Sequence, residues 1–538
     1  MNKKVLPLAV GAASAVVMSA AHSAMYINER GTGETLIYPW YSAQNDNNTL
    51  INIANTTDGH KAVKVRVLEA ENSQEVIDFN RYLSPKDHFS FAISATDGGG
   101  AKLATGDNSC TVPAIPAEGV EFRSLKYATD KQVTDPAAAT DYDNTGIGRT
   151  QVGYIEVIEM GQLDPDSPVI IDKTAGSTTN AAAAITHDAD GMPANCQILV
   201  DAWSNITGTD GVWLAESKTT DLTGDSEFMR TWQGGGLYGY ATVINVPTGA
   251  AFGYDAVAVA DHVATGATGS DMHYQPGDIR PNFGDLALDT AAIINVDGAA
   301  VTLDFDGDYP AESTERVQAL NATIMASEIY NDYVTDTTIG ATTDWLLTFP
   351  TKAFHVNADA PVEPFSKLWN GQSACEPTEL SAVDREESTP PPPPEAGSSG
   401  PDFSPAPPAD PVDPPAGDDV PICYEATIVQ FATESAAGTS SVAIGVNEYL
   451  DAADGWATIS MMPGDLDTAL SACGVDGVTA PEDPCTRTID AGDGTLQGLP
   501  VIGFAVQKFV NGGPGATYAM ATEHKSCAVG SGTASNDC

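Results

Sequence analysis

The fold is decided by a run of alternating residues, Ala62-Val63-Lys64-Val65-Arg66-Val67-Leu68-Glu69. Side chains along a β-strand point to opposite faces in turn, so alternating apolar and charged residues indicate a strand with one buried face. We expect Val63, Val65 and Val67 to face a core, and Lys64 and Arg66 to face solvent. The run therefore predicts a half-buried strand.

Strand-like segments of similar length flank this run, separated by turn residues. Asp58-Gly59 precedes it and is typical of a hairpin turn, and Ser84-Pro85-Lys86-Asp87 separates the two segments that follow it. Short strands at regular spacing favour a β-sandwich, which we predict over residues 24–130. Its strands are expected at residues 36–38, 49–55, 62–69, 76–83 and 89–93.

A second mainly-β region is predicted over residues 148–375, after a stretch typical of long loops at 95–147. It contains one expected helix near 313–330, because Ser313-Thr314 can cap it and Val317, Leu320 and Ile324 fall near helical spacing. The expected fold class is mainly β, with antiparallel β-sandwich domains, long loops and one or two helices. Further strands are expected at 151–160, 238–246, 251–260, 345–356 and, in a C-terminal β region over 422–538, at 422–431, 441–450, 455–461, 499–510 and 516–523.

A proline-rich segment, residues 389–421, separates the last two regions. It holds 13 prolines, five of them in a row from Pro390 to Pro394. Such a segment cannot form a packed core and favours an extended polyproline spacer. It is either a linker between free domains or, if Cys375 and Cys423 pair across it, a protruding loop.

The charge of the chain is extreme. The 538 residues carry 73 Asp and Glu against 24 Lys and Arg, a formal net charge of −49. Nucleic-acid binding and basic-patch binding to anionic lipids need clustered cations, so this composition argues against both. With 42% hydrophobic residues, the chain still has ample material for buried cores.

The N-terminus reads as a secretory signal peptide over residues 1–23. Lys3 and Lys4 form a basic start, residues 5–21 are largely apolar, and small residues follow at the expected cleavage site. An uncleaved membrane anchor is the alternative interpretation, which the shortness of the run disfavours. No later stretch reaches the roughly 18 apolar residues of a spanning helix, so we predict a secreted protein without a transmembrane segment.

Eight cysteines lie beyond the predicted signal peptide, an even number that favours disulfides in an exported chain. Pairing of sequence neighbours is the simplest of many possible connectivities. A structural zinc site is the alternative, which the absence of any CxxC disfavours. The expected pairs are Cys110 with Cys196, Cys375 with Cys423, Cys473 with Cys485, and Cys527 with Cys538.

No catalytic residue is predicted, because the chain lacks the GxSxG, HExxH and P-loop signatures. Asp261-His262 and Asp271-Met272-His273 place carboxylates beside imidazoles, which a metal site or an acid/base pair would need. In a chain this acidic, chance explains most such adjacency. We therefore predict that the protein is not an enzyme.

Calcium is the better-motivated ligand, because it prefers hard oxygen donors and carboxylates spaced by two can surround one cation. No cluster completes an EF-hand loop, and each taken alone also fits an Asp/Gly turn on a solvated surface. Ca²⁺ is the only cofactor we predict. The candidate ligands are Asp304, Asp306 and Asp308, then Asp188 and Asp190, then Asp141 and Asp143.

Several stretches of the chain together form a recognisable set. They are Leu36-Ile37-Tyr38-Pro39-Trp40-Tyr41, residues 49–57, 61–69, 76–80 and 153–161, and Asp344-Trp345-Leu346-Leu347-Thr348-Phe349-Pro350-Thr351-Lys352. With them the chain resembles a group of exported proteobacterial surface proteins, in particular the S-layer protein of marine gammaproteobacteria. The resemblance spans most of the chain after the predicted signal peptide, and its motifs are strands without a catalytic residue. It implies a two-dimensional lattice outside the outer membrane that contributes to biofilm matrix.

The expected function is a cell-surface structural protein that self-assembles, with divalent cations bridging its acidic loops. Its expected partners are further copies of itself and, through cations, outer-membrane lipopolysaccharide. One alternative is a secreted carbohydrate-active hydrolase, which needs two carboxylates at a set separation in a cleft. Another is a glycan-binding adhesin using Trp40, Trp203, Trp213 and Trp232, although core packing is the preferred interpretation of each Trp.

Overall fold

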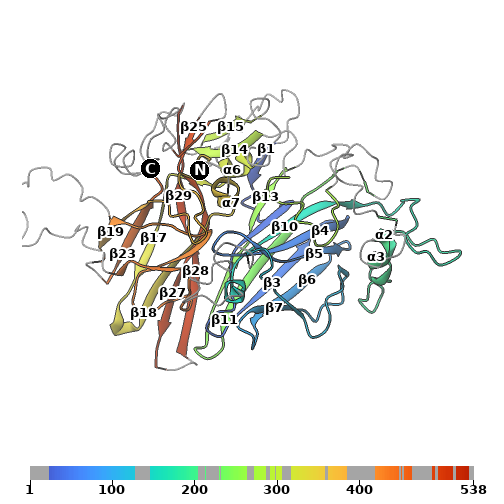
Figure 1. Ribbon diagram of the computed structural model, residues 1–538, viewed down its shortest axis with the longest axis horizontal. Helices are drawn as coiled ribbons and strands as arrows, with labels where there is room; N and C mark the ends of the chain where they lie inside the picture. The colour runs from blue at the N-terminus through green and yellow to red at the C-terminus, as the bar shows by residue number, and fades with distance from the viewer. Residues whose placement is uncertain are drawn as a thin grey trace, which may run out of the picture.

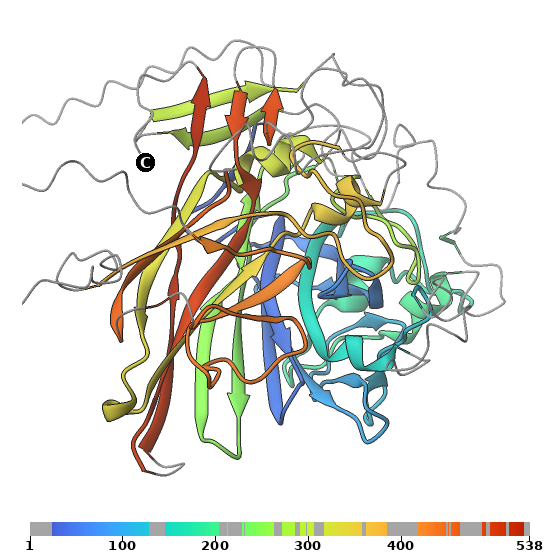
Figure 2. The same ribbon diagram turned by 60° about the vertical axis from the view of Figure 1, so that its left-hand side comes forward.

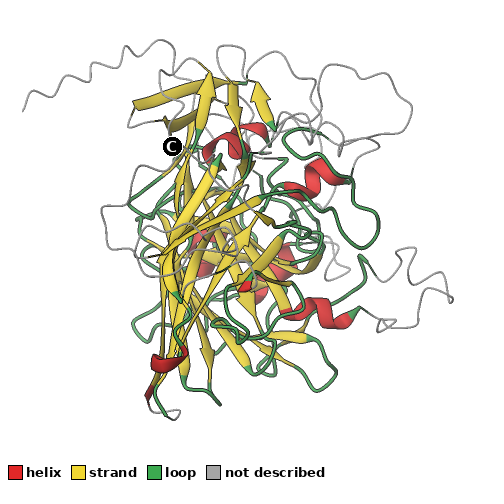
Figure 3. Ribbon diagram, turned by 90° about the vertical axis from the view of Figure 1, so that its left-hand side faces the viewer, coloured by secondary structure: helices red, strands yellow, loops and turns green. Residues whose placement is uncertain are grey.

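The computed structural model describes residues 24–127, 146–203, 212–213, 229–230, 232–262, 272–285, 291–296, 299–305, 317–357, 362–384, 418–447, 450, 453–462, 487–490, 495–512 and 516–531. Over these residues the chain is mainly β, with short helices among long strands (Figure 3). Nearly all of its strand pairs are antiparallel, so the predicted fold class is confirmed. The predicted signal peptide lies outside the described residues.

Two sheets form a first sandwich on the right of Figure 1. Val63, Val65 and Val67 of β4 pack with Ile51 and Phe91 of the opposite sheet, as the alternation predicted. The nine-stranded sheet has the order β15 (Ala299–Asp304), β14 (Ala291–Val296), β1 (Ala24–Ile27), β13 (Val257–Ala260), β2 (Thr35–Ser42), β10 (Val152–Leu163), β4 (His60–Glu69), β5 (Glu75–Leu83), β8 (Thr111–Val112). The six-stranded sheet has the order β12 (Ala250–Asp255), β11 (Leu237–Asn245), β3 (Asn47–Asn55), β6 (His88–Ala95), β7 (Ala101–Ala104), β9 (Val120–Glu121).

This sandwich extends well beyond residues 24–130. β10 lies between β2 and β4, and β11 pairs with β3. The prediction of a hairpin turn at Asp58-Gly59 is wrong, because β3 and β4 belong to different sheets and the turn carries the chain from one sheet to the other. A turn signal alone cannot distinguish a hairpin from a crossing between layers.

A second sandwich lies beside the first, on the left of Figure 1. Trp345 and Leu347 of β18 pack with Ile329 and Ile459 of the opposite sheet. The other face of β18 belongs to the core of the first sandwich, and β12 lies beside β28 (Figure 2). Its sheets have the orders β20 (Asp418–Asp419), β19 (Glu379–Asp384), β23 (Asp454–Ser460), β17 (Glu328–Val334), β29 (Lys525–Cys527), and β22 (Ala443–Gly445), β21 (Ala426–Gln430), β18 (Ala341–Thr348), β27 (Ile502–Val510), β28 (Thr517–Glu523).

The remaining elements are short. β16 (Met325–Ala326) pairs with β26 (Leu499–Pro500), and a small sheet contains β24 (Thr488–Asp490), β25 (Thr495–Gln497) and β30 (Val529–Ser531). The helices of the described residues are α2 (Ala181–Ile185), α3 (Gln197–Ala202), α6 (Gln318–Thr323) and α7 (Lys352–Val356), with 3₁₀ turns at Ile147–Gln151 and Thr337–Ile339. None of these helices has the length and hydropathy needed to cross a membrane.

The helix predicted near 313–330 is only partly right. α6 covers Gln318–Thr323, and the chain then enters β16 and β17. Pairing of β17 with β23 outweighs the helical spacing, and it places Ile329 in the core of the second sandwich. The strand predicted over 345–356 is also partly wrong, because β18 ends at Thr348 and α7 follows. Ser313-Thr314 lies outside the described residues.

The prediction that Lys64 and Arg66 face solvent is wrong. Both are buried, and β4 is covered on its second face as well. Residues 272–285 lie over this face, where Asn80 of β5 donates to the carbonyl of Tyr274 (2.8 Å). Helices α2 and α3 cover the neighbouring part around Ala62 and Tyr82. The alternating charges therefore lie under a second layer of chain.

Lys64 and Arg66 are both paired with carboxylates. Lys64 Nζ donates to Asp78 (3.0 Å) and to the carbonyl of Gln275 (2.9 Å). Arg66 pairs with Glu75 through Nε (3.0 Å) and with Glu156 of β10. Because a buried charge is tolerated only when it is paired and hydrogen-bonded, these ion pairs explain how the alternating run can be buried on both faces.

Two predicted disulfides are confirmed, Cys110–Cys196 and Cys375–Cys423. Cys527 is also disulfide-bonded, whereas Cys473, Cys485 and Cys538 lie outside the described residues. β19 and β20 pair with each other on the two sides of the proline-rich segment. The two ends of that segment therefore belong to the same sheet of the second sandwich. Its residues 389–417 lie outside the described residues.

Asp344 of β18 provides a test of the second core. Its Oδ2 accepts hydrogen bonds from Ser435 Oγ and the Ala437 amide (2.8 Å). Burial raises the pKa of Asp344 to about 6, although these bonds lower it. A carboxyl with a raised pKa binds its proton more tightly in the folded chain, so its contribution to stability is full at low pH and is lost as the pH rises through 6.

We therefore expect the free energy of unfolding of the wild type, minus that of Asp344→Asn, to fall by about 2 to 3 kcal/mol between pH 4 and pH 7. Urea unfolding of both proteins across this range measures the difference. A difference that does not change with pH would contradict the assignment.

Candidate functional site

The predicted acidic clusters meet different outcomes. Asp188 and Asp190 are exposed in one turn, where Asp188 Oδ1 accepts the amides of Asp190 (2.9 Å) and Met192 (3.0 Å). This oxygen organises its own turn, as the alternative interpretation stated. Asp304 ends β15. The other candidates, Asp306, Asp308, Asp141 and Asp143, lie outside the described residues.

Within the described ranges, no three His, Cys, Asp or Glu side chains gather in a group that could hold a metal ion. Calcium binding therefore stays a prediction for the acidic loops.

The Asp–His pairs of the sequence do not form an exposed site. His262 is buried, its Nδ1 lies 2.8 Å from Thr35 Oγ1, and burial lowers its pKa to about 3. His273 is buried beside Tyr82, with 2.9 Å between Nε2 and the phenol oxygen. Asp271 lies outside the described residues. Both imidazoles are therefore parts of packed cores.

The four tryptophans considered for glycan binding are also buried, so the preferred interpretation of core packing is confirmed. Trp203 and Trp213 surround His273, each with its ring centre 4.8 Å from the imidazole. Trp456 on β23, which the sequence analysis did not select, is 45% exposed.

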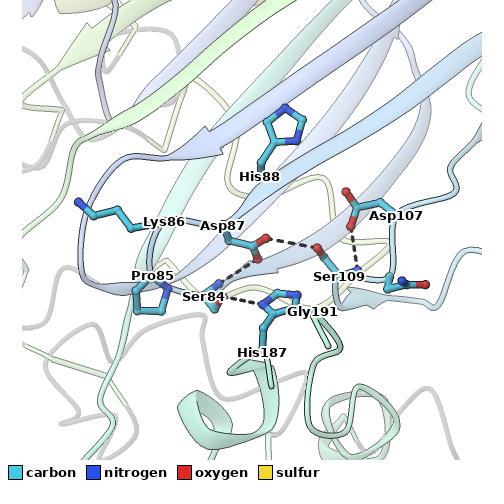
Figure 4. A pocket seen from close by; sticks show the side chains of 10 residues that line it. Ser84, Pro85, Lys86, Asp87, His88, Asp107, Ser109, His187 and Gly191 are labelled. Atoms are coloured by element: carbon cyan, nitrogen blue, oxygen red, sulfur yellow. Dashed lines mark hydrogen bonds between the residues drawn. The ribbon is translucent and has the colours of Figure 1, made fainter. Parts of the chain in front are cut away.

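One polar pocket of about 450 Å³ opens beside the turn between β5 and β6 (Figure 4). Three segments form it: residues 84–88, residues 107–109, and the turn at 187–191. The Cys110–Cys196 disulfide joins the chain next to the second segment to the start of α3. A covalent link thus holds the pocket walls together.

Ser84 and His187 form the most suggestive pair in this pocket, with 2.8 Å between Oγ and Nδ1. A serine nucleophile needs an imidazole base that is oriented by a third group, usually a carboxylate on the other ring nitrogen. No carboxylate of the described residues is bonded to His187. The Ser84 side chain is also nearly fully buried. The pair therefore links two turns.

The two aspartates of the pocket are already engaged by donors. Asp87 Oδ2 accepts from Arg81 (3.0 Å) and from the Ser84 amide (3.1 Å). Asp107 accepts the amides of Ser90 (3.3 Å) and Ser109 (2.8 Å). The lining contains no Phe, Tyr or Trp, so this pocket lacks the sugar-stacking rings expected of the alternative carbohydrate-active hydrolase.

The features that define the outside of the molecule were not predicted from the sequence. Lys64 and Arg66 were expected on the surface, and no prediction was made for the outward positions of β3, β6 and β11. Those positions could have been found from the alternation within 47–55, 88–95 and 237–245, where nearly every second residue is buried and most of the buried ones are apolar. Which of these strands are neighbours could not be read from the sequence.

No protein-family model matches the chain, and neither the curated proteins nor the solved structures contain a match to it.

Proposed function

We propose that the chain is an exported structural protein that self-associates into a layer on the cell surface, as an S-layer or biofilm-matrix lattice. Divalent cations, Ca²⁺ in particular, bridge the acidic loops of neighbouring copies. The same ions connect the layer to phosphate groups of outer-membrane lipopolysaccharide. The protein acts through its shape and charge and carries out no chemical reaction.

The observation that carries this proposal is the balance between buried Lys and Arg side chains and buried carboxyl groups. Among the described residues, six basic side chains are buried: Lys61, Lys64, Arg66, Arg81, Lys352 and Arg487. The buried carboxyl groups among the described residues nearly match them in number: Glu34, Glu69, Glu156, Glu159, Asp344, Glu376 and Glu425. The described interior is thus almost balanced in charge and contributes little to the net charge of −49.

A body with this surface repels its own copies unless the repulsion is screened or bridged. Salt shortens the screening length from about 10 Å at 0.1 M to about 3 Å at 1 M, and divalent cations bridge carboxylates directly. Assembly that depends on cations suits a protein exposed to a salty exterior. Inside a cell, the same surface would keep copies apart.

The architecture supports a mechanical role. β2 and β10 are buried along their whole lengths, and two disulfides close segments of 86 and 48 residues. Strands distant in sequence alternate within the nine-stranded sheet, and Leu346, Ile428 and Phe504 of the second sandwich belong to the core of the first, so the two sandwiches share packing. A subunit of this kind transmits load across a layer without opening.

Cell fractionation tests the proposal. We expect the chain among the most plentiful proteins of the surface fraction, released by chelator together with the layer. A scarce protein found only inside the cell would contradict it.

A further inference from the structure

The six-stranded sheet is open on one side. Burial alternates strictly along β3, β6, β11 and β12. The inward residues belong to the core of the first sandwich, and the outward residues are exposed or half-buried. This contrasts with the nine-stranded sheet, whose strand β4 is covered on both faces.

The outward positions of β3, β6 and β11 carry no Asp, Glu, Lys or Arg. We call these positions the uncharged face. Across its middle the register aligns Gly253, Thr242, Leu50, Ala92 and Ala104 in one row. Tyr240 lies next to this row, opposite Asn52. Small, amide and aromatic side chains therefore cover a continuous area, and Leu50 lies at its centre.

Charged residues of this sheet appear only at its margins. Asp255 lies on β12 at one edge, and Lys102 and Glu121 lie opposite each other on β7 and β9 at the other edge. In a chain with a net charge of −49 and 18% charged residues, an area without charge three strands wide is unusual. Two copies can meet here without desolvating carboxylates or facing like charges.

The area fits a weak contact. The three strands of the uncharged face are eight or nine residues long; spaced about 4.8 Å apart at about 3.3 Å per residue, they cover about 400 Å². Two such faces bury about 800 Å², which is in the range of weak, transient interfaces. A weak contact of this size suits a layer in which it is repeated many times.

We infer that the uncharged face binds the same face of a second copy. Two open sheets then pack face to face around a two-fold axis, and the dimer is the building unit of the layer. This inference rests on the proposed self-association. Leu50 lies near the axis, because it is at the centre of a surface that pairs with itself.

A charge-swap experiment tests this arrangement. Leu50 is 38% exposed, so Leu50→Glu and Leu50→Lys are expected to fold with unchanged circular dichroism and melting temperature. Each variant alone places like charges at the axis and should dimerise at least about 100-fold more weakly than the wild type. An equal mixture of the two variants should recover dimers, because Glu then faces Lys. Sedimentation in salt that screens the net charge measures all three.

Thr522→Glu is the matched control, because it adds the same charge at an exposed position of β28, outside the uncharged face. It should dimerise like the wild type. Dimers of both Leu50 variants at wild-type strength, or no recovery in the mixture, would overturn the face assignment while leaving self-association intact. Glycan binding by the wild-type monomer that both Leu50 variants lose would assign the face to a carbohydrate and overturn the inference. A wild type that never associates would instead reject the proposed function.

Discussion

Replacing Lys61 by Met is expected to lower the free energy of unfolding by about 3 to 5 kcal/mol. Lys61 Nζ donates to Glu159 Oε1 at 2.6 Å, and both side chains are fully buried. Glu159 Oε2 also accepts the amide of Gly235 (3.0 Å). The substitution leaves a buried carboxylate without its cation, and the loss of that cation costs more than the pair itself contributes.

The double variant Lys61→Met/Glu159→Gln separates the cost of an unpaired buried charge from the cost of changed packing. A glutamine keeps an oxygen for the Gly235 amide and carries no charge, so most of the lost stability should return. Arg230→Met is the control, because its pair with Asp164 is partly exposed and should be worth less than about 1 kcal/mol. Urea unfolding measures all three proteins. Equal effects of Lys61→Met and Arg230→Met would show that burial of cations is not a property of this fold.

Removing the Cys375–Cys423 disulfide by alanine substitution of both residues is the second large effect. The bond closes 48 residues, which in the chain-entropy model stabilises the fold by about 4 kcal/mol. Ala374 and Ile422, which lie next to the two cysteines, belong to the core of the second sandwich. We therefore expect loss of the disulfide to destabilise this core and to lower the melting temperature. Calorimetry of the oxidised wild type and the double variant measures the shift.

Deleting residues 391–412 with both cysteines retained gives the matched control. Loop-closure entropy changes slowly with length, so this deletion should change the free energy of unfolding by about 1 kcal/mol or less. If the deletion destabilises the protein as much as loss of the disulfide does, the proline-rich loop contributes contacts to the fold and the cross-link is not the main source of stability.

Alternation in the sequence predicts individual strands well, because burial of one face requires it. β4 was found in this way, and so was its inward set of Val63, Val65 and Val67. The sequence cannot tell what covers the other face. Lys64 and Arg66 have the residue types of a solvated face. Residues 275 and 278, which lie far away in the sequence, accept from Lys64 in the structure, and Arg66 is buried between Glu75 and Glu156.

The disulfides and the uncharged face differ in how far local sequence patterns could predict them. Neighbouring cysteines paired as expected at Cys110–Cys196 and Cys375–Cys423, because they close segments that return to the same part of the fold. The uncharged face depends on β3 lying between β6 and β11, a neighbourhood that joins segments almost 200 residues apart. No local pattern encodes that order, so the absence of charge becomes meaningful only after the sheet is assembled.

Electron microscopy of the purified protein without residues 1–23, the predicted signal peptide, imaged with Ca²⁺ and again after addition of chelator, tests the central claim most directly. We predict an ordered two-dimensional array in Ca²⁺ that disperses when the cation is removed, since nothing then bridges the acidic surfaces. Single unordered molecules under both conditions would contradict the account.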